Sequence, residues 1–577
     1  MSNKDIIALL KDTAQLLTLH GANPFQVGHY NKAVLRLEQL TQEVAGLSLE
    51  ALSKLAGMEP STIKFIEEIN RTGTLQRWEE LTVATPQGVQ EMLSLRGIGP
   101  KKVGALWKEL GIASLPALQR ACEAGRVAQL PGFGPRTQAT IQASLAFKAE
   151  QAGRFHYASA LPYATALEAR LQEAFPACLV ALTGAVRRKM EVVEQVEVLV
   201  GTDQVQAIMQ WLDKEAMLHK STQLTESLAW RGQFVENALK LSILFCPPNA
   251  FYKQLILQTG SAAHLALLVQ EGKPLRAVVD SMLELHSEAA AYAQAGLPYI
   301  PPELREGQIE MTWAHDKNAP KLLEMKDLQG VLHNHTAYSD GRHSLEAMAV
   351  HCKDLGYEYI GITDHSQYAS YAGGLTPDAI TKQHREIDHL NKKLAPFKIF
   401  KGIEADVLGD GQLDYTSDIL ACFDFVIASV HTGLNMDREK ATERIIKAIH
   451  NPYTTILGHL TNRLLLKREG FPVDYRAIID ACAEYGVIIE INGNPWRLEL
   501  DWRWVDYALS KNVWISINPD AHTKEAIQHM YFGVCVGRKG GLTPAHTFNT
   551  LSSEEVAKYL QRRKLGISKG MERSSNF

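Results

Sequence analysis

The sequence predicts a multidomain protein with an all-helical N-terminal region, a mixed α+β middle and a C-terminal α/β barrel of parallel strands alternating with helices. The chain has 577 residues, which is too many for a single core. Through its first quarter, apolar residues recur at the three-to-four spacing of helices. From residue 328 onward, short apolar runs alternate with helical segments, which is typical of a barrel built from βα units.

Composition excludes several classes of protein. Hydrophobic residues make up 46% and charged residues 21%, as in ordinary globular proteins, and the net charge of -4 gives no global sign of nucleic-acid binding. No apolar run is long enough for a bilayer, and the start MSNKDIIALLKD lacks the apolar stretch of a signal peptide, so we expect a cytoplasmic protein without membrane contact. The seven cysteines form no CxxC pair, which indicates reduced thiols.

Shifts in pattern predict five segments along the chain. They are a helical domain at 1–85, a second helical domain at 86–153, a mixed domain at 154–300, a Pro-rich polar linker at 301–327 and the barrel at 328–570. In the mixed domain, ACLVALTGA, VEQVEVLVG and ALKLSILFC are predicted strands.

Two near-copies of one turn lie in the second helical domain, GIGPKK from Gly97 and GFGPR from Gly132, and both are typical of helix-hairpin-helix units. Paired glycines allow a tight turn and a close approach to a ligand, and the helix that follows points its free N–H groups at a phosphate. The sequence therefore predicts contacts with the DNA backbone. The predicted DNA-binding residues are Gly97, Gly99, Lys101, Lys102, Gly132, Gly134 and Arg136.

A plain helical hairpin is the alternative interpretation of each turn. It is favoured for a third stretch, Ala56-Gly57-Met58-Glu59-Pro60, because this stretch lacks the second glycine and has an acid where a phosphate would lie.

Polar side chains end each strand-like run of the predicted barrel. The runs are GVLHNH, YIGITDHS, IFKGIEAD, FVIASVH, TTILGHL, VIIEINGN and WISINPDAH. Because the C-terminal ends of parallel barrel strands meet on one face, these side chains should share one pocket, which Asp340 can join from the loop after the first run. The candidate metal ligands are His333, His335, Asp340, His365, Glu404, His431, His459, Asp520 and His522, more than one metal can use. Asn492 and Asn494 end the sixth run.

Blocks along the whole chain carry a resemblance to the bacterial family X DNA polymerases. They include NPFQVGHYNKAV, the two GxG turns, TGAVRRKMEVVEQVEVLV, PPNAFYKQLILQTGSAAH, PPELREG and HNHTAYSDG. The resemblance implies an 8-kDa-like DNA-binding domain at 1–85, a fingers-like tandem of helix-hairpin-helix units at 86–153 and a degenerate nucleotidyltransferase-like palm and thumb at 154–300. It also implies a C-terminal PHP (polymerase and histidinol phosphatase) domain, a distorted (β/α)7 barrel in which the matched ligand positions hold two or three metals.

The palm departs from the family pattern at the positions that matter for synthesis. The family uses three aspartates to hold two metals, but the matched positions here are Gln195, Glu197 and Ser242, and Ala185 replaces a serine implied in triphosphate binding. Two-metal transfer needs closely placed carboxylates. We therefore expect that polymerase activity is lost and that the domain is a scaffold.

The basic run 187–189 in the palm is open to two interpretations, a DNA contact or a solvated charged stretch. Three further groups in the barrel are similarly open. Asp364 could orient a ligating histidine or serve at the surface or as a helix cap. Arg497 could hold a substrate phosphate or pair with Asp501 at i, i+4, and Lys467 and Arg468 are weaker phosphate candidates.

The predicted chemistry is metal-dependent hydrolysis of phosphoesters. The His-rich ligand set favours Zn²⁺ or Mn²⁺, with Fe²⁺ also compatible, over Mg²⁺. The expected nucleophile is a metal-bound hydroxide, and no protein nucleophile is required. The resemblance implies a 3′-5′ exonuclease that trims DNA 3′ ends in base-excision repair.

Three alternatives stay open: a gap-filling polymerase with an attached exonuclease, a small-molecule phosphatase, and a DNA-binding scaffold whose metals are structural. DNA is the expected partner, and the sequence indicates no protein partner.

Overall fold

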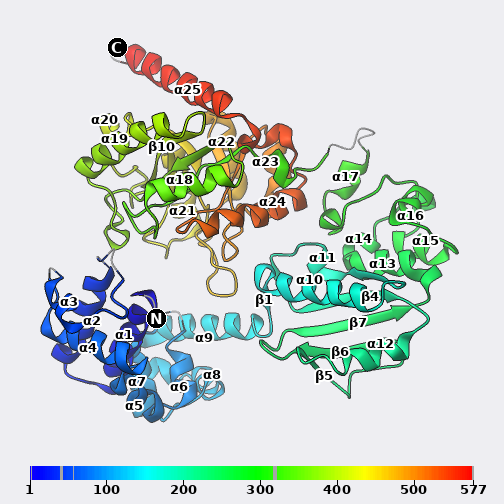
Figure 1. Ribbon diagram of the computed structural model, residues 1–577, viewed down its shortest axis with the longest axis horizontal. Helices are drawn as coiled ribbons and strands as arrows, with labels where there is room; N and C mark the ends of the chain where they lie inside the picture. The colour runs from blue at the N-terminus through cyan, green and yellow to red at the C-terminus, as the bar shows by residue number, and fades with distance from the viewer. Residues whose placement is uncertain are drawn as a thin grey trace. The chain divides into compact units, whose positions relative to one another are not determined.

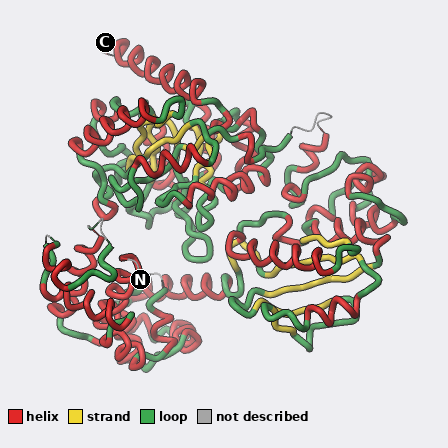
Figure 2. Tube along the Cα trace, viewed as in Figure 1, coloured by secondary structure: helices red, strands yellow, loops and turns green. Residues whose placement is uncertain are grey.

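Figure 1 shows a computed structural model of the protein, which describes residues 1, 3–38, 40, 43–55, 57–95, 97–315 and 321–574. The chain forms two compact units, Met1–Ala152 and Gly153–Phe577. The predicted fold class is confirmed, because the first unit is helical and the second combines an α+β part with a barrel of seven parallel strands. Figure 2 shows the strands of the second unit in yellow among their helices.

The first unit is a helical domain with its own apolar core, which includes Leu10, Ile66, Leu106 and Leu118. Its described elements are α1 (Asn3–His20), α2 (Pro24–Glu38), α3 (Leu49–Lys54), α4 (Pro60–Thr72), α5 (Gln76–Ala84), α6 (Gln87–Met92), α7 (Pro100–Leu110), α8 (Leu115–Glu123), the 3-10 turn η1 (Val127–Gln129) and α9 (Gly134–Glu150). Proline at the first position starts α4 and α7, where its missing N–H costs nothing.

The second unit begins with a five-stranded mixed sheet in the order β2-β4-β7-β6-β5, in which β4 and β7 are parallel and the other pairs are antiparallel. The strands predicted in this region are present as β2, β4 and β7. The strands are β1 (Phe155–His156), β2 (Leu179–Leu182), β3 (Val192–Val193), β4 (Gln195–Gly201), β5 (Leu218–Lys220), β6 (Ala229–Phe234) and β7 (Lys240–Cys246), and β1 pairs separately with β3.

Helices connect the strands of this part and continue after its last strand. They are α10 (Tyr157–Ala174), α11 (Gly184–Arg187), α12 (Val205–Leu212), η2 (Pro248–Ala250), α13 (Phe251–Thr259), α14 (Ala262–Leu265), η3 (Gln270–Gly272), α15 (Leu275–Ser281) and α16 (Glu288–Gln294). Helices α13 to α16 share a small core of their own with Ile300 and Leu304.

The segment 301–315, expected to belong to a linker, instead packs against these helices as η4 (Pro302–Leu304) and α17 (Glu310–His315). Arg305 is fully buried and its Nη1 donates to Glu288 Oε1 at 2.6 Å. The buried Glu310 lies 2.9 Å from the Nδ1 of His264. Paired charges of this kind let a polar stretch enter a core. Residues 316–320 of the expected linker lie outside the described residues.

The barrel follows, with all neighbouring strands parallel in the order β14-β13-β12-β11-β10-β9-β8. The strands are β8 (Gly330–Val331), β9 (Tyr359–Ile362), β10 (Lys398–Asp406), β11 (Phe425–Ser429), β12 (Thr454–Leu457), β13 (Ile488–Asn492) and β14 (Ile515–Asn518). The first and last strands meet beyond their ends, where His335 N donates to Ala521 O at 2.8 Å. All seven predicted runs therefore form strands, and their C-terminal ends lie on one face.

Helices pack around the barrel and bury its main apolar core. They are η5 (Met325–Asp327), α18 (Leu345–Asp354), η6 (Ser370–Ala372), α19 (Pro377–Lys393), α20 (Ser417–Leu420), α21 (Arg438–Ile449), α22 (Tyr475–Tyr485), α23 (Trp502–Ser510), η7 (Glu525–His529), α24 (Met530–Lys539), η8 (Pro544–His546), η9 (Phe548–Thr550) and α25 (Ser553–Ser574). Glycine makes room inside the barrel at Gly402, where an added Cβ would lie 2.5 Å from the Phe425 ring.

Among the described helices, none is long and apolar enough to cross a membrane. All seven cysteines are free thiols.

Candidate metal centre and nucleic-acid sites

The structure brings all nine predicted ligand side chains together at the C-terminal face of the barrel. Glu404 lies on β10, and the others follow strand ends: His333 and His335 after β8, His365 after β9, His431 after β11, His459 after β12, and Asp520 and His522 after β14, with Asp340 on the loop after β8. Ligands scattered over almost two hundred positions thus meet because parallel barrel strands point the same way.

Glu404 lies at the centre of the cluster and is fully buried. Its carboxylate oxygens lie 2.9 Å from His365 Nδ1, 3.0 Å from His459 Nε2 and 3.2 Å from His431 Nε2. Burial alone would raise the pKa of Glu404, but the imidazoles of His431 and His333 hold it well below its ordinary value. A carboxylate surrounded by imidazoles can bridge neighbouring cations.

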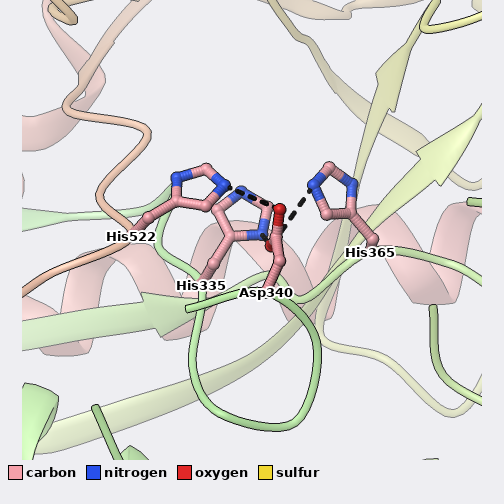
Figure 3. A group of neighbouring side chains, drawn as sticks. All are labelled: His335, Asp340, His365 and His522. Atoms are coloured by element: carbon pink, nitrogen blue, oxygen red, sulfur yellow. Dashed lines mark ion pairs between the residues drawn. The ribbon is translucent and has the colours of Figure 1, made fainter. Parts of the chain in front are cut away.

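A second group lies at the mouth of the pocket and includes Asp340, whose side chain is 36% exposed. Figure 3 shows three imidazoles pointing at this carboxylate from different segments of the chain, with Nε2 of His522 at 3.3 Å, Nε2 of His365 at 3.6 Å and Nδ1 of His335 at 3.8 Å. Burial, together with the neighbouring His522 and His365, lowers the pKa of His335 to about 3, so this ring is neutral and available as a donor.

The donor set fits divalent metals. Buried and without a hydrogen-bond partner among the described residues are His333 Nε2, both ring nitrogens of His335, His365 Nδ1 and both carboxylate oxygens of Glu404. Unpaired buried polar atoms are costly, and a cation between them removes the cost. Three groups have donor atoms within 4.8 Å of one another: His335, Asp340, His365 and His522; His333, His335 and Asp520; His365, Glu404 and His431.

These groups overlap at His335 and His365. A neutral imidazole has one lone-pair nitrogen, so each of these two rings can ligate in only one group at a time. His459 belongs to none of the three groups, although it contacts Glu404. The cluster could therefore hold two or three metals that share ligands.

Two buried acids behind the cluster were not identified from the sequence. Glu490 on β13 lies 2.6 Å from His333 Nδ1, and Asp406 on β10 lies 3.0 Å from His431 Nδ1. Each carboxylate holds its ring with the other nitrogen facing the pocket. Strand alternation could have found them, because Asp406 lies two residues after Glu404 and Glu490 two before Asn492, on the same strand faces.

Asp364 is fully buried, so neither the surface nor the helix-cap interpretation holds. It accepts hydrogen bonds from Thr336 N at 2.8 Å, Ser339 Oγ at 2.5 Å and Gln383 Nε2 at 2.6 Å. Asp364 thus fixes the loop that carries Asp340, rather than orienting a ligating histidine directly.

Arg497 reaches the metal cluster, and the alternative pair with Asp501 is wrong. Its Nε lies 3.5 Å from Asp520 Oδ2, and its Nη1 donates to Asn462 Oδ1 at 2.6 Å. Asp501 pairs with Arg463 at 2.5 Å and with Arg503 at 2.9 Å instead.

The other polar residues near this edge have structural contacts. Asn492 donates to Asp520 Oδ2 at 3.1 Å, Asn494 Oδ1 accepts from Trp496 N at 3.1 Å, and Arg468 donates to Asn462 O at 2.7 Å. The Lys467 side chain has no contact with a described residue that would place it in the site.

Tyr371 at the mouth of the cluster was also missed by the sequence reasoning. Its ring lies 6.4 Å from the His365 ring and its side chain is 65% exposed. An exposed aromatic ring beside a buried charged cluster is a surface on which a planar group can stack.

The two GxG turns of the first unit have the geometry expected of them. Gly97, Gly132 and Gly134 have φ of 83°, 80° and 68°, a region that favours glycine. Gly99 is the N-cap of α7, where an added Cβ would meet nothing within 4 Å. The open backbone there permits close approach of a phosphate.

The cations of these turns differ in exposure. Lys101 and Arg136 are exposed, and neither α7 nor α9 has an acid in its first turn. Lys102 is partly buried and donates to Thr137 Oγ1 at 3.3 Å. In the third stretch, Ala56 lies outside the described residues, and Glu59 pairs with Lys32 at 3.2 Å.

The palm positions lie side by side as the resemblance implies. On the parallel strands β4 and β7, Glu197 is opposite Ser242 and Gln195 is opposite Lys240. Glu197 turns towards Gly184, where an added Cβ would lie only 1.6 Å from its Oε2. Burial raises its pKa, while Arg188, Gln195 and the Ala185 backbone N–H act in the opposite direction.

The basic run 187–189 is neither a DNA contact nor a solvated charged stretch, because its three cations form internal ion pairs. Arg187 pairs with Glu288 at 2.6 Å, Arg188 with Glu306 at 2.9 Å and Lys189 with Glu303 at 2.9 Å. The three cationic side chains are only 14% to 23% exposed.

Family models match three parts of the chain: a helix-hairpin-helix domain at 1–75, a SAM-like helix-hairpin-helix tandem at 89–146 and a PHP domain at 332–494. The third match covers the strand ends from His333 to His459, and the second covers both GxG turns.

Among curated proteins, the DNA polymerase/3′-5′ exonuclease PolX of Bacillus subtilis is 32% identical over 97% of this chain and 100% of its own length. A probable phosphatase of Thermoanaerobacter sp. is 28% identical over 41% of this chain and 97% of its own length. Among solved structures, a polymerase beta of Leishmania infantum matches at 15% identity over 38% of this chain and 98% of its own, with a TM-score of 0.23, too low to carry an argument. Full-length similarity at this level, with the helix-hairpin-helix and PHP matches in the same order, shows that the chain belongs to the bacterial family X DNA polymerases with a PHP domain.

Proposed function

We propose that this protein is a metal-dependent 3′-5′ exonuclease that processes DNA 3′ ends in repair through its barrel, and that its palm no longer synthesises DNA. One observation carries the proposal: the barrel gathers eight buried or half-buried residues in three donor groups, with His459 against Glu404 as the ninth, whereas the palm positions retain a single carboxylate. The name of the Bacillus subtilis relative, DNA polymerase/3′-5′ exonuclease PolX, supports DNA as the substrate.

The nine donors His333, His335, Asp340, His365, Glu404, His431, His459, Asp520 and His522 would hold two or three metals, with Zn²⁺ or Mn²⁺ favoured by the imidazole-rich set. Bound metals supply an activated water and neutralise charge on the phosphate oxygens. The protein contributes the placement of the donors, through Glu490 and Asp406 on two imidazoles and through Asp364 on the loop of Asp340.

Two side chains at the mouth would position the DNA end. Arg497 lies 3.5 Å from Asp520, and its guanidinium can turn a donor towards a phosphate oxygen of the scissile link. Tyr371, exposed and close to His365, can stack on the terminal base. The turns of the first unit would contact a DNA backbone through Gly97, Gly99, Lys101, Lys102, Gly132, Gly134 and Arg136.

The palm positions lack the charge that nucleotide transfer requires. Gln195 and Ser242 supply no negative charge, Ala185 supplies no hydroxyl, and Glu197 is turned towards Gly184 and Arg188. A single carboxylate on the palm face does not place two divalent cations side by side for nucleotide transfer.

One gel tests both halves of the proposal. A 5′-labelled oligonucleotide is incubated with the full-length protein and Mn²⁺, with and without deoxynucleoside triphosphates. We expect a ladder of products shortened from the 3′ end, loss of the ladder in Glu404→Gln, and no extension of a primer. The exposed Glu554→Gln is the matched control. No shortening by metal-loaded protein contradicts the exonuclease, and templated extension contradicts the loss of synthesis.

A small-molecule phosphatase is the second candidate, favoured by the similarity of the barrel alone to a probable phosphatase. Tyr371→Ala separates the two candidates. For an exonuclease that stacks the terminal base, it should raise KM for the oligonucleotide about tenfold, as expected for a stacking contact of 1–3 kcal/mol. Turnover of a simple phosphate monoester should be unchanged. An unaffected KM for DNA favours the phosphatase.

A further inference from the structure

The palm sheet carries a pocket of about 320 Å³ on the face where family X enzymes would hold their metals. Strands β4 to β7, labelled in Figure 1, supply most of its lining, including Gln195, Lys220, Arg231, Gln233, Lys240 and Ser242. The volume is in the range of small-ligand sites. The pocket is separate from the metal cluster of the barrel, and none of its lining residues is among the nine donors.

The charge of this pocket is positive. Lys220, Arg231 and Lys240 line it, His219 adds an imidazole, and no acid is among the described residues that do so. Glu197, the remaining carboxylate of the palm positions, is outside the lining because it turns back over Gly184. Lys220 and Arg231 each have one acidic partner beside the pocket, and Lys240 has none among the described residues, so the lining favours an anion over a divalent cation.

The cations of the pocket are available to a ligand. Lys240 is exposed, and its ammonium contacts no acceptor among the described residues. Only Nη1 of the Arg231 guanidinium donates to described groups, Leu224 O at 2.7 Å and Glu226 at 3.1 Å. Lys220 pairs with Asp213 at 2.7 Å. The acids of these two pairs are 38% and 71% exposed, and ion pairs open to solvent contribute little, so a phosphate can compete for both cations.

We propose that the palm has exchanged a metal site for a metal-independent phosphate-binding pocket that holds a nucleic-acid strand. Lys240 and Arg231 would contact phosphate oxygens directly, with Gln195, Gln233 and Ser242 as neutral hydrogen-bond partners. Gln195 and Ser242 replace two of the three aspartates of the family, which removes repulsion that such a phosphate would otherwise meet. The proposal does not depend on the activity of the barrel.

The test measures binding of a labelled single-stranded oligonucleotide by the full-length protein in excess chelator, which also prevents cleavage. For each protein, log K is plotted against log salt. Each contact to a single strand contributes about 0.7 to the slope. We expect the double variant Lys240→Ala/Arg231→Ala to lower the slope by about 1.4. The matched control Arg276→Ala/Lys558→Ala removes one arginine and one lysine, both exposed, from outside the pocket and should leave the slope unchanged.

Two further arms complete the test. Lys240→Ala alone breaks no described contact, so its expected decrease of about 0.7 holds even if loss of Arg231 disturbs the fold. Competition with a deoxynucleoside triphosphate in chelator identifies the source of the phosphate: displacement from the parent at micromolar concentration assigns the pocket to nucleotides rather than to a strand and overturns the strand proposal. Equal slopes for pocket and control variants also overturn it.

Discussion

Glu490 orders two parts of the metal cluster at once. Its Oε1 lies 2.6 Å from His333 Nδ1 and accepts from Asn518 at 3.1 Å, while its Oε2 accepts from the backbone N–H of His459 at 2.8 Å. A carboxylate that accepts from Nδ1 keeps the Nε2 lone pair of His333 pointed into the pocket. Glu490 therefore acts through a ligand and is a positioning residue.

Replacement of this carboxylate tests that role. We expect Glu490→Gln to weaken metal affinity about 10–100-fold, because the amide keeps only part of the hydrogen bonding behind His333 and His459. Metal binding is measured by competition with a chromophoric chelator, and the proposed exonuclease activity should recover when metal is raised. Glu554→Gln is the exposed control. Unchanged metal affinity in Glu490→Gln would show that the acid only supports packing.

At the scale of single elements, each GxG turn couples a glycine bend to a helix start. Gly99 and Gly134 lie at the starts of α7 and α9, and each helix has a proline in its first turn and no acid there. The N-terminal dipole and the exposed Lys101 or Arg136 then favour the same anion. The two turns also contact each other, since Lys102 reaches Thr137.

This coupling predicts a change in salt dependence. We expect Lys101→Ala and Arg136→Ala each to reduce the slope of log K against log salt for duplex DNA by about 1, with hydrolysis of a phosphate monoester unchanged. Binding is measured by fluorescence anisotropy. The control is Lys558→Ala, a lysine of α25 with a 59% exposed side chain paired with Glu554. A slope identical to that of the parent in both variants would favour plain helical hairpins.

Elements with local signals could be predicted from the sequence, and elements held by distant partners could not. The seven barrel strands and their donors follow from apolar runs that end in polar residues, and each glycine turn is visible in a few letters. The basic run 187–189 is different, because Arg187 and Arg188 bond to residues 101 and 118 positions away. Arg305 was equally hidden from the sequence, because its burial depends on its bond to Glu288. This pair makes a polar segment part of a core.

At the scale of the second unit, these hidden pairs join the palm to the barrel. Glu303 accepts from Arg538 of α24 at 2.8 Å and pairs with Lys189 of the palm at 2.9 Å. Lys539, whose side chain is 1% exposed, donates to Arg188 O at 3.1 Å and bonds Glu306. A palm that keeps only one of the three acids of the family is therefore still built into the support of the barrel, which gives a physical reason for its retention.

Glu303 makes this junction dependent on pH. Although burial would raise its pKa, Lys189 and Arg538 lower it from 4.5 to about 2. A depressed carboxyl pKa contributes stability that is complete above the unfolded value and is lost as pH falls towards the folded one. The shift corresponds to roughly 3 kcal/mol at pH 7.

We therefore expect Glu303→Gln to lower the free energy of unfolding of the second unit at pH 7. The difference from the parent should narrow by roughly 1 kcal/mol between pH 7 and pH 4, because Glu303 of the unfolded parent takes up a proton near its ordinary pKa of 4.5 while the folded carboxylate stays ionised. Urea unfolding of the full-length protein at both pH values, followed by tryptophan fluorescence, provides the measurement, with Glu554→Gln as the exposed control. A difference that stays constant with pH would mean that packing at position 303, rather than its charge, holds palm and barrel together.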